Sequence, residues 1–390
     1  MTDQDVWGMT TRIIHGQDCK DAQGSPSLPL YDTTTFAFKT TEALLSVIEG
    51  THEGNLYTRY GMNPTLRALE TMLAALEGAE QAWAFSSGMA ALSAVFLAHG
   101  QQGIVCVGDC YGGTLELMQT QLPSLGIKTH TLLSSEGDRL ASILKAGIGL
   151  LFFESPSNPT LDIVDIRAMA DLAHAHGAKV VIDSTFATPV NQQPLSLGAD
   201  LVVHSATKYL GGHSDLTAGA VMGSTAMLKP IAPWRKNLGT AIAPVTAALL
   251  ARSLRTLPLR VRQQNASAGR IAQFLEGHPQ VTRVYYPGLP SHPGHDLACR
   301  QMQGFGGMLA LDIAGQREDA TRVAEKLNLF LLAPSLGGTE SLVTQPCTTS
   351  HHDVDPAERL RRGIGDTMLR LSVGIEDVDD LLADLEQALS

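Results

Sequence analysis

The sequence of 390 residues is poor in basic residues and contains no run of them. Its 28 lysines and arginines stand against 39 aspartates and glutamates, which gives a formal net charge of -11. A nucleic-acid-binding surface needs a basic face to meet the phosphates, so this balance argues against a nucleic-acid partner. Apolar residues make up 44% of the chain and charged residues only 17%. The chain can therefore build a large core, which excludes global disorder.

Cysteines and long apolar segments are also few. There is no C-x-x-C pair, and no histidine or third cysteine completes a metal site beside Cys106 and Cys110. No apolar run is long enough to span a bilayer, and the N-terminal MTDQDVWGMT lacks the charged-then-apolar pattern of a signal peptide. We therefore expect a cytoplasmic protein with free thiols and with neither a metal nor a membrane partner. The five cysteines are Cys19, Cys106, Cys110, Cys299 and Cys347.

Nucleotide-binding loops are missing as well, since no G-x-G-x-x-G follows a predicted strand and no P-loop occurs. What the sequence does contain is an alternation of short apolar runs with helical patterns. This alternation predicts a mostly parallel sheet covered by helices on both faces. In such sheets, ligands bind beyond the carboxyl ends of the strands. The predicted strands cover residues 103–109, 149–155, 179–184, 200–205 and 219–224.

The pattern divides the chain into three parts. Residues 1–60 are rich in Thr, Gly and Pro, show little periodicity, and are interpreted as an extended arm. Residues 61–249 carry the alternation and form the predicted large domain, which begins with a helix after Asn63 that stops at Gly78. Residues 250–390 contain a long helix, two further strand-like runs and a C-terminal helix, which predicts a smaller α/β domain.

Polar residues follow three of the predicted strands, and they converge on one rim if those strands are neighbours. A lysine in a partly dehydrated pocket has a lowered pKa and becomes a nucleophile toward aldehydes. An aspartate can keep a pyridinium nitrogen protonated, so that the ring accepts electrons. The turn at residues 86–89 opens an apolar helix and can bind a phosphate. Pyridoxal phosphate meets all three conditions, although each residue taken singly could be an ordinary loop residue. The polar set is Glu154, Asn158, Asp183, Ser205, Thr207 and Lys208.

Eight stretches, spread from the arm to the C-terminal part, make the chain resemble a known family. The chain is similar to the pyridoxal-phosphate enzymes of cysteine and methionine metabolism, which include cystathionine γ-synthases, cystathionine lyases, methionine γ-lyases and homoserine sulfhydrylases. The resemblance implies the fold type I architecture, pyridoxal 5'-phosphate as cofactor, and a homotetramer built from two catalytic dimers. The stretches are YTRYGMNPT, SSGMAAL, DCYGGT, FFESPSNPT, VIDSTFATP, HSATKYLGGHSD, PSLGGTESL and LRLSVGIE.

The resemblance also implies which residues would hold the cofactor. Lys208 would bind it covalently and later move protons, Asp183 would pair with the ring nitrogen, and Tyr111 would stack on the ring. Tyr57 and Arg59, in the arm, would reach the phosphate in the partner subunit, and Tyr57 is a candidate catalytic residue together with Tyr111 and Lys208. The phosphate of the same subunit would be held by Ser87, Gly88, Met89, Ser205 and Thr207.

The substrate end of the site follows from the same resemblance. Arg370 would bind the substrate α-carboxylate in a bidentate contact, with Asn158 and the region of Ser335 assisting. Glu154 would lie behind the ring or serve only as a structural carboxylate at a strand end; both interpretations stay open.

Four positions depart from the patterns of particular family members. Glu116 replaces an arginine that usually pairs with a distal carboxylate, so it would repel such a group and attract a distal cation. Leu56 and Pro334 stand where cystathionine γ-lyases often have glutamates, and Gly113 stands where methionine γ-lyases usually have a cysteine. The leading hypothesis is therefore a γ-lyase for L-canavanine, which would yield homoserine and hydroxyguanidine, unless Glu116 points to solvent.

Several alternatives stay open for the reaction. The first is a methionine or cystathionine γ-lyase, a homoserine sulfhydrylase or a cystathionine γ-synthase. The second is an aminotransferase or β-lyase on the same fold. A non-enzymatic relative would be expected to have lost Lys208, Asp183 or Arg370, and all three residues are present.

Overall fold

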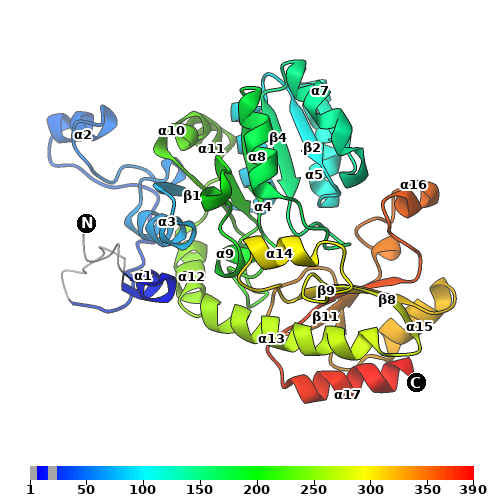
Figure 1. Cartoon of the computed structure of the whole chain (residues 1–390). Helices are drawn as coiled ribbons and strands as arrows, with labels where there is room; N and C mark the ends of the chain where they lie inside the picture. Colours follow the sequence, from blue (N-terminus) through cyan, green and yellow to red (C-terminus); the bar gives the residue numbers. More distant parts are fainter. Residues whose placement is uncertain (1–6, 16–23) are drawn as a thin grey trace.

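The computed structural model describes residues 7–15 and 24–390, so that Cys19 lies outside the described residues. Its larger sheet has seven strands in the order β1-β7-β6-β5-β4-β2-β3 (Figure 1). The neighbouring strands β6, β5, β4, β2 and β3 run parallel to one another. At the other edge of the sheet, β7 pairs antiparallel with both β6 and β1. The mostly parallel α/β sheet predicted from the sequence is confirmed. The strands are β1 (Gln81–Phe85), β2 (Ile104–Val107), β3 (Thr129–Leu132), β4 (Leu150–Glu154), β5 (Lys179–Asp183), β6 (Leu201–His204) and β7 (Gly219–Gly223).

Helices cover both faces of this sheet because its central strands are apolar on both sides. Phe152 and Val181 belong to a buried cluster with α4 (Gly88–His99). Val180 and Ile182 point the other way, into a cluster with α7 (Leu140–Lys145) and α8 (Ile166–Ala175). Strands buried on both faces require such continuous apolar runs, and the two helical layers leave only the strand ends open for polar chemistry.

The helix predicted after Asn63 is α3 (Pro64–Glu77), and local residues define both of its ends. The Asn63 side chain accepts a hydrogen bond from the N–H of Thr65, and proline occupies the first helical position. At the other end Gly78 adopts a left-handed conformation with φ of 65°, which glycine accepts without steric cost. The predicted start and stop of this helix are therefore confirmed.

A second, five-stranded sheet has the order β10-β11-β12-β9-β8. It packs against α13 and α17, which lie side by side (Figure 1). The predicted division at residues 249 and 250 falls inside α12 (Pro244–Leu254), which packs on α3, and the division into domains stays a prediction. The elements are β8 (Val281–Tyr285), β9 (Met308–Ile313), β10 (Leu331–Leu332), β11 (Leu342–Thr344), β12 (Met368–Ser372), α13 (Leu257–Glu276), α15 (Arg317–Lys326) and α17 (Val378–Leu389).

The N-terminal part contains more regular structure than the sequence pattern indicated. It includes two short helices, α1 (Met9–His15) and α2 (Thr41–Ile48), and a 3-10 turn at Thr58–Tyr60. The interpretation of this part as an extended arm therefore did not include these short helices. No helix in the described ranges is long and apolar enough to cross a membrane. The other short helices are α5 (Gly112–Glu116), α6 (Leu122–Ser124), α9 (Thr188–Asn191), α10 (Thr225–Leu228), α11 (Ala232–Leu238), α14 (His295–Gln301) and α16 (Pro356–Arg361).

The packing of the core lets us predict how two leucine-to-alanine substitutions, one buried and one exposed, change the free energy of unfolding. Leu69 in α3 is 0% exposed, whereas Leu259 in α13 is 65% exposed. We expect Leu69→Ala to lower the free energy of unfolding by about 2–5 kcal/mol, because it removes buried apolar atoms and leaves a cavity. Leu259→Ala should change it by less than about 0.5 kcal/mol. Urea denaturation of both variants measures the difference, and equal effects would contradict the described packing.

Candidate active site

A cavity of about 760 Å³ lies between the two sheets, at the carboxyl ends of β4, β5 and β6. The seven-stranded sheet contributes residues from these ends and from the beginning of α4, and the smaller sheet contributes Thr344 of β11 and Arg370 of β12. The polar strand ends predicted to converge are thus brought together. Predicted site residues that line the cavity are Ser87, Gly88, Met89, Tyr111, Glu154, Asn158, Asp183, Ser205, Thr207, Lys208, Ser335 and Arg370.

Lys208 lies in the turn that follows β6 and reaches the cavity with its amine. Its Nζ donates a hydrogen bond to Ser335 Oγ at 2.7 Å. Burial, together with the nearby guanidinium of Arg370, lowers the pKa of Lys208 from its ordinary value to about 8. Both causes disfavour the charged ammonium. The amine is therefore partly uncharged near neutral pH, which is the form that attacks an aldehyde.

Two carboxylates lie side by side behind this amine, because Glu154 and Asp183 are register partners of β4 and β5. Burial raises the pKa of both groups, and the charge of Asp183 raises the pKa of Glu154 further. Asp183 Oδ1 accepts hydrogen bonds from both the N–H, at 2.9 Å, and the hydroxyl of Thr185. These donors stabilise a charge on Asp183, so Asp183 is the member of the pair suited to hold a cationic ring nitrogen.

The beginning of α4 forms a close contact with the turn after β6. A Cβ atom at Gly88 would lie 2.9 Å from the Cβ of Ser205 and 3.0 Å from its Cα, so only glycine permits this approach. Ser87 is the N-cap of α4, and its Oγ accepts from the N–H of Ala90 at 3.1 Å. Gly88 and Met89, the first two residues of this twelve-residue helix, line the cavity, and an anion is favoured at such a helix start.

Arg370 places a second cation in the cavity although it is almost fully buried. Its Nη1 donates to Asn158 Oδ1 at 2.8 Å and its Nη2 to the carbonyl of Ser335 at 3.2 Å. Within residues 7–15 and 24–390 no carboxylate forms an ion pair with it. Burial lowers the pKa of Arg370 to about 10, so it stays charged at neutral pH. A buried, charged guanidinium without a counter-ion suits a substrate carboxylate.

Three predicted site residues lie outside the cavity of their own chain. Tyr57 and Glu116 are exposed, and neither they nor Arg59 line the cavity. Arg59 instead donates to the carbonyl of Lys236 at 2.7 Å and lies 5.0 Å from the ring centre of Tyr60. Their predicted roles therefore need a partner subunit or a substrate that extends beyond the cavity.

Sequence reasoning missed several cavity residues. Thr185 lies two residues after Asp183, and a hydroxyl residue at this distance from a strand-end carboxylate was a usable signal. Thr349 and Ser350 carried no such signal, because they come from a loop of the smaller sheet about 195 residues beyond the end of β4. The further lining residues include Pro156, Phe186, Thr217, Pro334 and Leu336.

The amine, the carboxylate and the helix start in one cavity fit an aldehyde that carries a phosphate and a ring nitrogen. The family model described as Cys/Met metabolism PLP-dependent enzyme matches residues 10–390. The chain belongs to this family. It is therefore one of the pyridoxal-phosphate-dependent α/β enzymes, as the resemblance in the sequence implied.

Individual relatives of this family member agree with that assignment. The chain is 45% identical over 364 residues to cystathionine gamma-synthase 1, chloroplastic, of Arabidopsis thaliana, covering 93% of this chain but 64% of that longer protein. It is 41% identical over 387 residues to L-methionine gamma-lyase of Pseudomonas putida, covering 98% of this chain and 97% of that protein. A Campylobacter jejuni crystal structure that contains N'-pyridoxyl-lysine-5'-monophosphate superposes with a TM-score of 0.94 at 30% identity, covering 98% and 100% of the two chains.

The lowered pKa of Lys208 predicts a distinct pH dependence of its labelling. With a pKa of about 8, roughly a tenth of the Lys208 amines are uncharged at pH 7. We expect acetylation of Lys208 in cofactor-free protein to reach half of its maximal rate at about pH 8. Peptide mass spectrometry over a pH series measures this rate, and the exposed Lys128 reports the reagent's own pH dependence. Parallel profiles for the two lysines would contradict the environment described for Lys208.

Proposed function

We propose that the chain catalyses γ-elimination or γ-replacement on an L-amino acid that carries a leaving group at Cγ. The supporting observation is the convergence of Lys208, Asp183 and Arg370 in one cavity with the start of α4. This set provides an amine for the cofactor aldehyde, an anion for its ring nitrogen, a cation for the substrate and an anion site for the phosphate. Membership in a family that includes such enzymes supports the same reaction class.

The residues of the chain would act as follows. Arg370 would hold the substrate α-carboxylate, with Asn158 fixing the guanidinium from the other side. Lys208 would hold the cofactor aldehyde, give up its place to the substrate amine, and then accept the proton at Cα. An amine with a pKa of about 8 can both accept and return a proton near neutral pH. Bound pyridoxal phosphate would supply the electron sink for bonds broken at Cα and Cβ.

The remaining roles concern orientation and the fate of the substrate. Glu154 accepts a hydrogen bond from the Tyr111 N–H at 2.8 Å, so it would orient Tyr111 over the ring. Asp183 would keep the ring nitrogen protonated, and the start of α4 would hold the phosphate. Loss of the γ-substituent would end either in 2-oxobutanoate and ammonia or, with a nucleophile at Cγ, in a new γ-substituted amino acid. With water as that nucleophile the product would be homoserine.

The proposal also includes a cytoplasmic homotetramer with active sites shared between subunits. Tyr57 and Arg59 lie outside the cavity of their own chain. Exposed apolar side chains in the same N-terminal part, Leu30 and Tyr31, are suited to a subunit contact. On this proposal Tyr57 and Arg59 would approach the phosphate bound by the partner subunit.

For the substrate we propose an amino acid with a distal cation, with L-canavanine as the leading candidate. Glu116 lies at the end of α5, the helix that starts directly after Tyr111. Its exposed carboxylate does not line the cavity, so it would meet only the distal end of a substrate that extends beyond the cavity. A second candidate class, thioethers such as methionine or cystathionine, is supported by apolar residues in the cavity, among them Met89, Leu92, Phe186 and Leu336.

A substrate panel tests the proposed reaction. We expect 2-oxobutanoate, ammonia or a γ-exchanged amino acid from at least one of canavanine, cystathionine, methionine, homocysteine and O-acylated homoserines. Lys208→Ala should lower the rate by roughly 10²- to 10⁴-fold, because the base that moves the Cα proton is removed. Pyruvate formed from alanine or from cystathionine, with no γ-cleavage of any compound, would indicate an aminotransferase or β-lyase instead.

The covalent role of Lys208 has a separate test. Borohydride reduction of the enzyme loaded with pyridoxal phosphate should attach the cofactor to the peptide that contains Lys208. Peptide mapping by mass spectrometry locates the label, and a label on another lysine would refute the assignment.

The role of Glu116 predicts a selective effect on cationic substrates. We expect Glu116→Gln to raise KM for canavanine roughly tenfold, the scale of one partly exposed charge contact, and to leave KM for methionine within about twofold. Steady-state kinetics with both compounds measure the split. The control is Glu318→Gln on α15, which removes the same charge from an exposed site away from the cavity. Unchanged canavanine kinetics would remove Glu116 from the substrate site.

A further inference from the structure

One loop of the smaller sheet leaves its own sheet and reaches the seven-stranded one. This loop, residues 345–367, connects β11 to β12 and carries α16 (Figure 1). It contacts the segment 108–111, which follows β2 and leads into α5. Gly112, which follows this segment, lies close to the same loop, since a Cβ added there would be only 3.0 Å from the carbonyl oxygen of Ser350.

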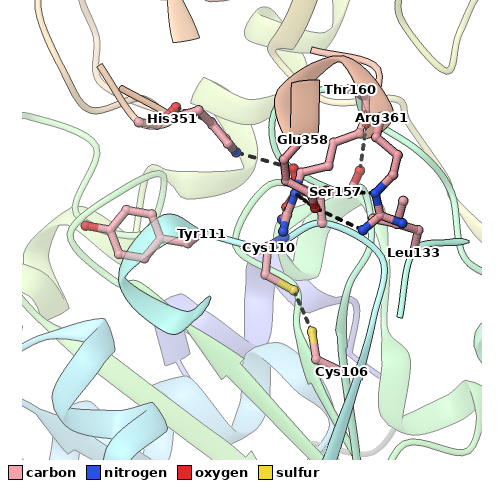
Figure 2. Close-up of polar contacts among 12 residues, drawn as sticks. Cys106, Cys110, Tyr111, Leu133, Ser157, Thr160, His351, Glu358 and Arg361 are labelled. Carbon is pink, nitrogen blue, oxygen red and sulfur yellow. Dashed lines mark hydrogen bonds and ion pairs between the residues drawn. The ribbon is translucent and has the colours of Figure 1, made fainter. Parts of the chain in front are cut away.

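Asp109 is the centre of the contact between these segments. Its Oδ1 accepts a hydrogen bond from Arg362 Nη1 at 2.7 Å, and its Oδ2 lies 3.3 Å from His351 Nε2. Asp109 and His351 are only 5% and 1% exposed. The ion pair between Arg362 and Asp109 is shielded from water, so removal of Arg362 leaves the Asp109 carboxylate uncompensated, and His351 adds a close contact through its Nε2. Figure 2 shows His351 directed toward this contact.

Each partner of Asp109 is itself held by a further contact. Arg362 Nε donates to Glu358 Oε1 at 2.9 Å, and the Nδ1 of His351 lies 2.9 Å from Ser350 Oγ. Arg361 also pairs with Glu358, but it points away and approaches Glu136 at 3.9 Å instead of Asp109. Arg361 and Arg362 both pair with Glu358. Of the two arginines, Arg362 is the one that also pairs with Asp109 and so joins the two segments.

Each of the two segments contributes a residue to the cavity wall. Tyr111 comes two residues after Asp109, and Ser350 directly precedes His351; both line the cavity. The side chain of Tyr111 is 52% exposed, so packing alone does not hold it. Its N–H is held by Glu154, and Asp109, two residues earlier in the chain, is held by the contact with the smaller sheet.

We propose that Asp109, Arg362 and His351 form a clamp that positions Tyr111 and Ser350 in the wall of the substrate cavity. The three are positioning residues, because they act through Tyr111 and Ser350 and do not themselves line the cavity. The inference deepens the proposed function and rests on it for its kinetic part. A displacement of about 1 Å in residues that position a substrate can lower kcat/KM by roughly 10²-fold. Loss of the clamp should therefore be measurable as a lower kcat/KM.

The test compares clamp variants with neighbouring controls. The variants are Asp109→Asn, Arg362→Gln and His351→Gln, and Arg362→Lys tests rescue of the charge. The controls are Arg361→Gln and His352→Gln, whose parent residues are 53% and 67% exposed in their side chains and make no contact with Asp109. Two of the clamp variants change the loop of the smaller sheet alone, so the test remains valid if Asp109→Asn fails to fold.

The first measurement is amide hydrogen exchange in the enzyme loaded with pyridoxal phosphate and free of substrate. We expect exchange in residues 346–363 and 111–118 to be roughly tenfold faster in the clamp variants than in the controls, because local opening becomes easier. The variants should still bind the cofactor, measured by titration of its visible absorption, because Lys208 and the start of α4 lie on other elements.

The second measurement separates kcat from KM with the best substrate. We expect kcat/KM to fall roughly 10- to 100-fold in Asp109→Asn and Arg362→Gln, with partial recovery in Arg362→Lys and no change in the controls. A purely structural ion pair would lower the melting temperature and leave kcat/KM of the folded enzyme unchanged. That result, or exchange that is unchanged in both segments, would overturn the proposal.

The two proposals fail in different ways. If the wild-type enzyme cleaves no γ-substituted amino acid but transaminates, the proposed function is wrong, and the clamp is still judged by hydrogen exchange and by the kinetics of transamination. If γ-cleavage is found but the clamp variants match Arg361→Gln and His352→Gln in both measurements, only the clamp is refuted.

Discussion

Burial of the Lys208 amine beside the Arg370 guanidinium is the constraint on which the rest of the site depends. Two cations in one cavity are unfavourable unless one of them gives up its proton, and the lysine is the weaker base of the two. Lys208 therefore has a pKa of about 8, while Arg370 keeps its charge. Lys208 can thus act as a nucleophile and Arg370 can bind an anion, although no carboxylate of the described residues pairs with Arg370.

The paired carboxylates show a similar division of roles. Glu154 and Asp183 are neighbours in register, and burial disfavours two charges so close together. Thr185 donates two hydrogen bonds to Asp183 and none to Glu154. Thr185 therefore favours the charge on Asp183, which we propose faces the ring nitrogen, while Glu154 accepts from the N–H of Tyr111.

The cavity exists only because two sheets from distant parts of the chain meet. The seven-stranded sheet supplies the amine, the carboxylates and the start of α4, whereas the smaller sheet supplies Arg370, Thr344 and the loop with Ser350. The contact of Asp109 with Arg362 and His351 is one place where the two parts are joined by charge. On our proposal, the geometry of the cavity wall depends on these three residues, which do not line the cavity.

Much of the fold could be predicted because the central strands are short, apolar and separated by helical patterns. The edge strands β1 and β3 were missed for physical reasons. Gln81–Phe85 follows a helix closely and pairs antiparallel, and Thr129–Leu132 is largely polar because one of its sides is not covered by another strand. Thr129–Leu132 therefore lacks the continuous apolar run of a central strand, whereas Gln81–Phe85 has one, AWAF, directly before the turn at residues 86–89.

The sequence by itself determined the family, the cofactor and most residues around Lys208, because these lie in short motifs at consecutive strand ends. Only the tertiary structure decided that Thr185 selects Asp183 as the anion, that Glu116 lies outside the cavity of its own chain, and that residues 345–367 complete the wall. These features depend on contacts between residues far apart in the chain or on the direction of a side chain. Local periodicity and spacing carry no information about either.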